Sequence, residues 1–155
     1  IYGICFTAQL LAFIHGGTIG RLEKTEAGYL SHTLTAEGKE DRLFGKMNTI
    51  FYGAHLHQDY VASLPSNLDS SVLAERNGFI HVYRIVLPNG SIVYGVQPHP
   101  EMSTPDNATL LVRVNEKWLR EEIGDNEYNR ALSVPNDADY GLSGTITNFV
   151  KMLKD

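Results

Sequence analysis

The pattern of apolar and polar positions predicts strands and helices in alternation along most of the chain. Residues 1–5 form a short apolar run typical of a buried strand, and apolar positions at helical spacing over 7–15 stop at two glycines. Further apolar and β-branched runs predict strands at 18–22, 29–34, 49–56, 60–64, 79–87 and 91–97. A final helix is expected over 143–153. This order predicts an α/β fold that begins with a strand, a sharp turn and a helix.

Two features interrupt this pattern. The pair Asn89-Gly90 lies between the last two predicted strands and is typical of a tight hairpin, whereas the segment AEGKED at 36–41 indicates a turn. From 104 to 140 the composition becomes polar, with one amphipathic helix predicted around Trp118. We expect a single domain over 1–155 with an insertion at about 104–140. That insertion is either a solvated segment or a lid or partner surface.

Composition narrows the setting without identifying the chemistry. The 155 residues are 43% hydrophobic, enough for one globular core, and the formal net charge of −5 comes with no basic stripe. We therefore expect neither a nucleic-acid partner nor a membrane partner. The apolar start has no basic flank and is interrupted by Gln9, so it matches neither a signal peptide nor a membrane span. A single cysteine cannot form an internal disulfide, which favours a reducing compartment such as the cytoplasm.

Cys5 lies where the first predicted strand meets the first predicted helix. Backbone N–H groups and the helix dipole at such a turn favour a thiolate, and the turn points the side chain out of the sheet, as in a nucleophile elbow. A lone cysteine in an apolar run is more often a buried structural residue. The position of Cys5 alone therefore leaves both interpretations open.

A second candidate group follows the last predicted strand, in the segment GVQPHPE. In extended backbone, residues two apart project to the same side, and Pro100 favours an extended conformation at His99. The carboxylate of Glu101 is then placed to hold the imidazole of His99 in one tautomer and to stabilise its charged form. Short motifs of this kind often arise by chance, so the pair gains meaning only from its surroundings.

Taken in order, the segments GICFTAQ, GG, HQDYVASLP, GVQPHPE and TITNFVKML resemble the class I glutamine amidotransferase domain over most of the chain outside 104–140. The resemblance implies a doubly wound, flavodoxin-like α/β sheet with flanking helices, and glutamine or a γ-glutamyl small molecule as substrate. It implies Cys5 as the nucleophile, His99 as its base and Glu101 as the group that orients His99. Family domains have several strands and helices before the nucleophile, so we expect this chain to be the later part of a longer polypeptide.

Further site residues follow from the same resemblance. Gln9 and His57 match positions that contact or adjoin the substrate, and Leu56 stands where many members have a serine near the α-amino and carboxylate groups of glutamine. The backbone N–H of Phe6, the residue after the nucleophile, is expected to donate to the oxyanion. The implied reaction requires no metal and no cofactor. His55 and His57 have a spacing that zinc can use, but no cysteine or carboxylate accompanies them in a recognisable pattern.

Three functions are compatible with these observations. The leading one is hydrolysis of the glutamine γ-carboxamide through a Cys5 thioester, with the ammonia passing to a synthase partner or domain. A γ-glutamyl peptidase or hydrolase would use the same residues, and Leu56 favours it because leucine offers no hydroxyl to a glutamine. The third is a catalytically silent binding or regulatory domain. It is favoured if Thr7, where the family usually has glycine, crowds the packing of strand and helix and misplaces Cys5, or if the expected preceding part of the domain is absent in the cell.

Overall fold

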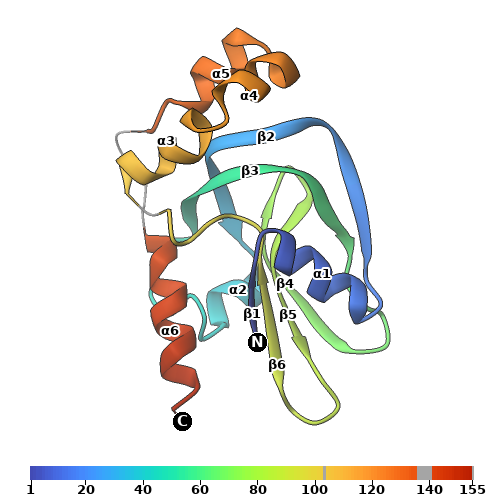
Figure 1. The fold of residues 1–155 in the computed structure, drawn as a ribbon. Helices are drawn as coiled ribbons and strands as arrows, with labels where there is room; N and C mark the ends of the chain where they lie inside the picture. Colours follow the sequence, from blue (N-terminus) through green and yellow to red (C-terminus); the bar gives the residue numbers. More distant parts are fainter. Residues whose placement is uncertain (103, 136–140, 155) are drawn as a thin grey trace.

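A computed structural model describes residues 1–102, 104–135 and 141–154 (Figure 1). The strands in these ranges are β1 (Tyr2–Ile4), β2 (Thr18–Leu34), β3 (Ile50–Ser63), β4 (Asp69–Arg76), β5 (Phe79–Val86) and β6 (Ile92–Val96). The helices are α1 (Phe6–Ile14), α2 (Ala36–Glu40), α3 (Pro105–Arg113), α4 (Glu116–Ile123), α5 (Asp125–Ala131) and α6 (Gly144–Met152), with a 3-10 turn, η1 (Gly141–Ser143), before α6. Within the described ranges, every helix is too short or too polar to cross a bilayer.

The strands form one mixed sheet in the order β1-β6-β5-β3-β2-β4. β1 and β6 run parallel, whereas β2 to β6 pair with one another in antiparallel fashion. Because β4 also pairs with β5, the strands β2, β3, β4 and β5 close into a small barrel-like unit. The α/β architecture expected from the sequence is therefore present, and among the described strands its parallel pairing is confined to β1 and β6.

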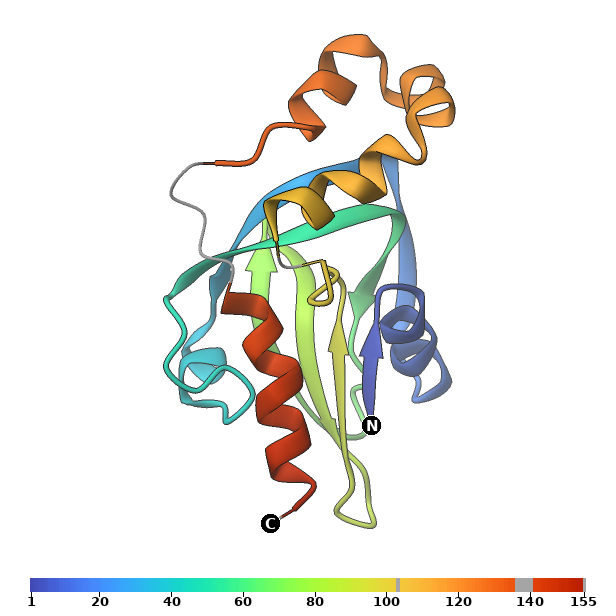
Figure 2. The ribbon, with the colours of Figure 1, turned by 60° about the vertical axis from the view of Figure 1, so that its left-hand side comes forward.

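Side chains that alternate along the central strands supply two hydrophobic cores on opposite faces of the sheet. Val93 of β6 packs with Leu11 of α1, whereas its neighbour Tyr94 belongs to the core that Phe149 of α6 covers. Figures 1 and 2 show α1 and α6 on opposite flanks of β1 and β6. This covering of both faces by helices is the arrangement expected of a doubly wound sheet.

The helices of the predicted insertion lie over the curved strands β2 and β3 (Figure 2). Their apolar cluster, which includes Leu119 and Tyr128, packs against Leu56 of β3. At the closest approach, a Cβ on Gly28 of β2 would lie 2.7 Å from the carbonyl oxygen of Ala131, and Gly28 has a φ of 102°. Only glycine meets both conditions, so this residue allows α5 to pack on the sheet.

Several sequence predictions are confirmed and others are corrected. The first strand and helix, the hairpin at Asn89-Gly90 and the last helix are present. The strands predicted at 18–22 and 29–34 are parts of one long strand, β2, and those predicted at 49–56 and 60–64 are parts of β3. The turn expected at 36–41 contains the short helix α2. The sequence pattern does not predict β4, because register shifts around Val72 and Ala74 break its alternation. The stretch 104–135 holds three helices rather than one, and 136–140 lie outside the described residues.

Candidate active site

Cys5 lies on the turn between β1 and α1 with φ 49° and ψ −114°, a backbone conformation that residues other than glycine rarely adopt. Such a conformation costs about 1–3 kcal/mol and persists only where the surrounding structure enforces it. Here the Cys5 N–H donates to the carbonyl of Val96 at 2.8 Å, and the Cys5 carbonyl accepts from the N–H of Gln9 at 3.1 Å. The side chain is partly exposed at the carboxyl end of the parallel strand pair, as in a nucleophile elbow.

The close packing of α1 on β1 depends on Gly3. A Cβ at this position would lie 2.5 Å from Leu11 Cδ1 and 3.1 Å from the backbone nitrogen of Ala8. Thr7, by contrast, is exposed. A threonine at this position therefore does not crowd the contact between strand and helix. Thr7 thus no longer supports the hypothesis of a catalytically silent domain.

His99 and Glu101 follow β6, and their backbone is attached to β3. A single antiparallel bridge pairs Ala54 with His99, whose N–H donates to the Ala54 carbonyl at 2.9 Å. The Nδ1 atom of His99 lies 2.7 Å from Oε1 of Glu101, and the imidazole is near enough to Cys5 for this side chain to raise the pKa of His99. Since Nδ1 is occupied by Glu101, Nε2 is the nitrogen available to the sulfur. The structure therefore brings Cys5, His99 and Glu101 into one region, with a direct contact between His99 and Glu101.

The charges of this group favour an imidazolium. Burial opposes a charge on His99, but the hydrogen bonds to Cys5 and Glu101 and the negative charges of both groups outweigh it and raise the pKa of His99 to about 9. Burial of Glu101 is likewise outweighed by its hydrogen bond to His99, so the pKa of this carboxyl is lowered. At neutral pH the site therefore holds a protonated His99 beside an ionised Glu101.

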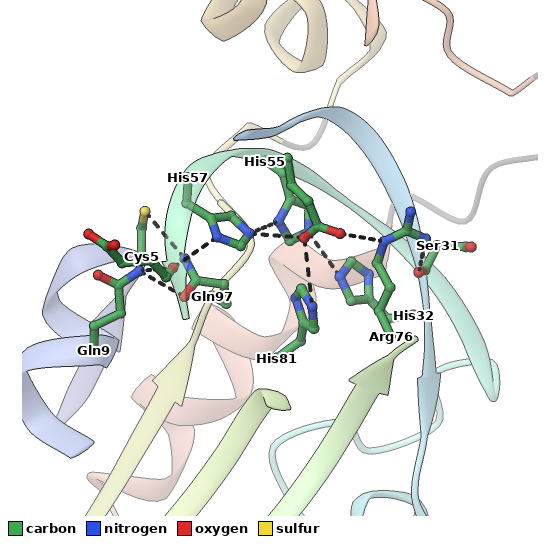
Figure 3. Close-up of polar contacts among 11 residues, drawn as sticks. Cys5, Gln9, Ser31, His32, His55, His57, Arg76, His81 and Gln97 are labelled. Atoms are coloured by element: carbon green, nitrogen blue, oxygen red, sulfur yellow. Dashed lines mark hydrogen bonds and ion pairs between the residues drawn. The ribbon is translucent and has the colours of Figure 1, made fainter. Parts of the chain in front are cut away.

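Two glutamines extend this group into the protein (Figure 3). The amide nitrogen of Gln97 lies 3.5 Å from the Cys5 sulfur, and its amide oxygen accepts from the side chain of Gln9 at 3.0 Å. Gln9 also donates to the carbonyl of Asp59 at 2.6 Å. Sequence reasoning did not select Gln97, although its place two residues before His99, at the end of a predicted strand, is a usable signal. Gln9 is therefore close to Cys5, with its amide hydrogens directed to protein acceptors.

The other predicted substrate residues occupy different surroundings. Phe6 is the first residue of α1, and the N–H groups in the first turn of a helix have no acceptor within that helix. The side chain of Phe6 is exposed. His57 is buried, and its Nδ1 lies 3.0 Å from the carbonyl of Asp59. Leu56 packs on the opposite side of β3, against the apolar cluster of α3 to α5. Substrate contacts of these residues stay predictions.

A buried cluster of histidines continues from His57 into the barrel-like unit (Figure 3). His57 Nε2 lies 2.9 Å from His55 Nδ1, and His55 Nε2 lies 2.9 Å from His32 Nε2. His81 of β5 packs against the rings of the other three. Burial lowers the pKa of His81 to about 4 and the pKa values of His32 and His55 well below the ordinary range, so these three imidazoles are neutral at pH 7. Of this cluster, the sequence analysis singled out only His55 and His57.

The chain belongs to the glutamine amidotransferase class-I family, whose sequence model matches residues 1–115. Among curated relatives, it is 29% identical over 140 residues to the GMP synthase (glutamine-hydrolyzing) of Kluyveromyces lactis, covering 84% of this chain and 25% of that protein. It is 32% identical over 113 residues to a GMP synthase (glutamine-hydrolyzing) subunit of Methanococcus aeolicus, covering 73% of this chain and 56% of that protein. These relatives are longer than the matched region, and the chain spans about a quarter of the first.

Solved structures agree on the fold. A glutamine amidotransferase of Thermotoga maritima matches 98% of this chain with a TM-score of 0.70 and 16% identity. A glutamine amido transferase of Methylobacillus flagellatus matches 99% of this chain with a TM-score of 0.68 and 18% identity. The match covers 61% of each of those chains. The fold class inferred from the sequence is thus confirmed, and the chain corresponds to part of each of these larger structures.

Proposed function

We propose that this chain carries the glutaminase chemistry of an amidotransferase: hydrolysis of the γ-carboxamide of glutamine through a thioester on Cys5. The observation that carries this proposal is the hydrogen-bonded pair of His99 and Glu101 beside Cys5, which stands on a strained turn at a helix N-terminus and raises the pKa of His99. Membership of the glutamine amidotransferase class-I family supports the same reaction class.

The reaction has two stages, and each uses the same residues. The Cys5 thiolate attacks the carboxamide carbon, a C–S bond forms, and the backbone N–H of Phe6 donates to the oxyanion. As the C–N bond breaks, the His99 imidazolium gives its proton to the leaving nitrogen, which departs as ammonia. Neutral His99 then takes a proton from water, whose oxygen attacks the thioester. The C–S bond breaks, which releases glutamate and returns Cys5 as a thiolate beside the His99 imidazolium. Glu101 holds the tautomer of His99 throughout.

The ammonia released in the first stage needs an acceptor in an amidotransfer reaction. We propose that a synthase, either a further domain or a separate protein chain, receives it, because curated relatives of the chain are glutamine-hydrolyzing GMP synthases and one of them is named as a subunit. The chemistry of this chain does not by itself select the ammonia acceptor. Reconstitution of the full-length protein with candidate acceptors identifies it.

A γ-glutamyl hydrolase is the second candidate, because the same three residues fit it. Leu56 packs into the apolar cluster of α3 to α5, so its side chain offers no hydrogen bond to the α-amino and carboxylate groups that glutamine and a γ-glutamyl peptide share. A γ-glutamyl peptide would present the same reacting carbonyl to Cys5 with a different leaving group. The catalytic steps are unchanged, except that His99 protonates an amine in place of ammonia.

Active-site labelling tests these alternatives on the full-length protein. A glutamine-mimicking electrophile is expected to add one adduct to the intact mass, and Cys5→Ser is expected to remove it, because the elbow and His99 make this thiol reactive. Excess glutamine should slow labelling if glutamine is the substrate, whereas a γ-glutamyl dipeptide should slow it if the hydrolase hypothesis is correct. Absence of labelling in the folded protein would contradict both enzyme functions and favour a silent domain.

A further inference from the structure

Four potential metal ligands meet inside the barrel-like unit. They are Glu26 of β2, His55 and His57 of β3, and His81 of β5, and one ligand atom from each lies within 4.8 Å of all the others. The strand register explains the meeting: Glu26 pairs with His57 across β2 and β3, and His55 and His57 share one face of β3 because they are two residues apart. Pairing of distant strands therefore assembles three imidazoles and one carboxylate.

The hydrogen bonds of His57 leave a place for a cation between it and Glu26. A carbonyl oxygen only accepts, so the contact of His57 Nδ1 with the Asp59 carbonyl at 3.0 Å puts the proton of a neutral His57 on Nδ1. Its Nε2 atom then presents a lone pair to Glu26 Oε2 at 3.3 Å. In this tautomer both atoms present lone pairs, so a cation bound between them would have both as ligands.

The atoms around these ligands are arranged as an outer shell. Arg76 Nε lies 3.3 Å from Oε1 of Glu26, which leaves Oε2 for the metal. His57 uses its other nitrogen on a backbone carbonyl, and His55 uses its other nitrogen on His32 Nε2 at 2.9 Å. Metal-binding histidines typically show this pattern, because the outer contact fixes the tautomer and the ring orientation. His81 Nδ1 is buried and has no hydrogen-bond partner among the described residues.

The separations suit a small tetrahedral ion. Tetrahedral zinc with bonds of about 2.0–2.1 Å holds its ligand atoms about 3.3 Å apart. His57 Nε2 lies 2.9 Å from His55 Nδ1, and Glu26 Oε2 lies 3.3 Å from His57 Nε2 and 3.9 Å from His81 Nε2. A cavity of about 600 Å³ between β2 and α5 is lined in part by Glu26 and Arg76, so it reaches the carboxylate end of the ligand set.

We propose that Glu26, His55, His57 and His81 bind one divalent transition-metal ion of the zinc type. Imidazole nitrogens with a carboxylate suit such an ion better than they suit magnesium or calcium, which prefer oxygen ligands. Four protein ligands complete a tetrahedron, so the site is structural and fastens β2, β3 and β5 to one another. The proposed role of the ion is in the fold, so this proposal does not depend on the proposed hydrolysis.

Zinc titration of the full-length protein tests the site. The protein is first freed of metal with a chelator that is then removed, and Zn²⁺ is added at neutral pH. We expect one Zn²⁺ per protein chain by calorimetry, and a rise in the unfolding temperature of about 5–10 °C at a hundredfold excess over the dissociation constant. Mg²⁺ should produce no shift, and Co²⁺ should give the intense visible absorption of tetrahedral coordination. Folded protein that neither binds Zn²⁺ nor is stabilised by it would overturn the proposal.

Matched variants locate the ion. Glu26→Gln keeps the shape of the side chain but removes its charge, and His81→Gln removes one nitrogen ligand; both are expected to weaken Zn²⁺ binding at least tenfold. His15→Gln changes a histidine at the end of α1, outside the cluster, and should bind like wild type. Circular dichroism establishes that each variant is folded. If one of the two ligand variants does not fold, the other and the wild-type titration decide the question. Unchanged zinc binding in a folded ligand variant would refute the assigned ligand set.

Discussion

His99 and His55 lie along one connected polar network, yet their surroundings favour opposite charge states. His99 is hydrogen-bonded to the carboxylate of Glu101, and this partner together with the nearby Cys5 raises its pKa to about 9 despite burial. His55 is completely buried, its hydrogen bonds go to His57 and His32, and its pKa is lowered well below the ordinary range. The comparison teaches that burial and partners together decide the charge of a histidine: a hydrogen-bonded carboxylate and a nearby thiol outweigh the partial burial of His99, whereas complete burial among other rings keeps His55 neutral.

The two regions also differ in how they are connected to the rest of the fold. The proposed catalytic group of Cys5, His99 and Glu101 is partly exposed and stands on turns that follow β1 and β6. The histidine cluster lies in the middle of strands, where its rings stack on one another and on Phe51. Substitutions in the first region should therefore affect chemistry most, and substitutions in the second should affect stability most.

The largest expected effect is on catalysis by His99→Ala. Loss of the acid and base should lower kcat/KM for glutamine hydrolysis by about 10²–10⁴-fold, measured as glutamate release by the full-length protein. Glu101→Ala should leave more residual activity, because Glu101 only orients the base. His15→Ala serves as the matched control and should retain wild-type activity. Activity within tenfold of wild type in His99→Ala would contradict the assignment of His99 as the base.

A smaller effect, on stability rather than chemistry, is expected from His55→Ala. The change empties a fully buried position and leaves ring nitrogens of His32 and His57 without partners, so the free energy of unfolding should fall by about 2–4 kcal/mol. Urea denaturation in the presence of a metal chelator measures this. His15→Ala should change the value by no more than about 0.5 kcal/mol. Equal stabilities for the two variants would show that the cluster is not part of the structural core.

The smallest expected effect is the pH dependence that His99 gives to stability. Its pKa in the folded protein is about 9 against an ordinary value of 6.5, so folding favours the protonated form. The stabilisation is fully present below about pH 6.5 and is lost as the pH rises through 9. Urea midpoints of wild type and His99→Gln should therefore converge between these values. Glu101→Gln should lower the upper limit of this range, because the carboxylate that raises the pKa is gone. A wild-type advantage that is constant from pH 6 to pH 10 would disprove the shift.

The amino-acid sequence by itself determined the features that depend on neighbours along the chain. Apolar spacing predicts the first strand and helix with Cys5 between them, and Asn89-Gly90 predicts the hairpin between β5 and β6. The contact of His99 with Glu101 follows from alternation over two residues. Each of these depends on local backbone geometry, which a short segment specifies without help from the rest of the molecule.

Only the tertiary structure decided what depends on partners far away in the chain. β2 continues through the polar stretch 23–28, where a register shift breaks the apolar alternation that would reveal a strand. Gln97 reaches Cys5 because β1 and β6 pair in parallel across 92 positions. Glu26 and His81 join His55 and His57 only through pairing of β2, β3, β4 and β5. Strand register places these side chains together, and register is set by packing of the whole sheet rather than by any single segment.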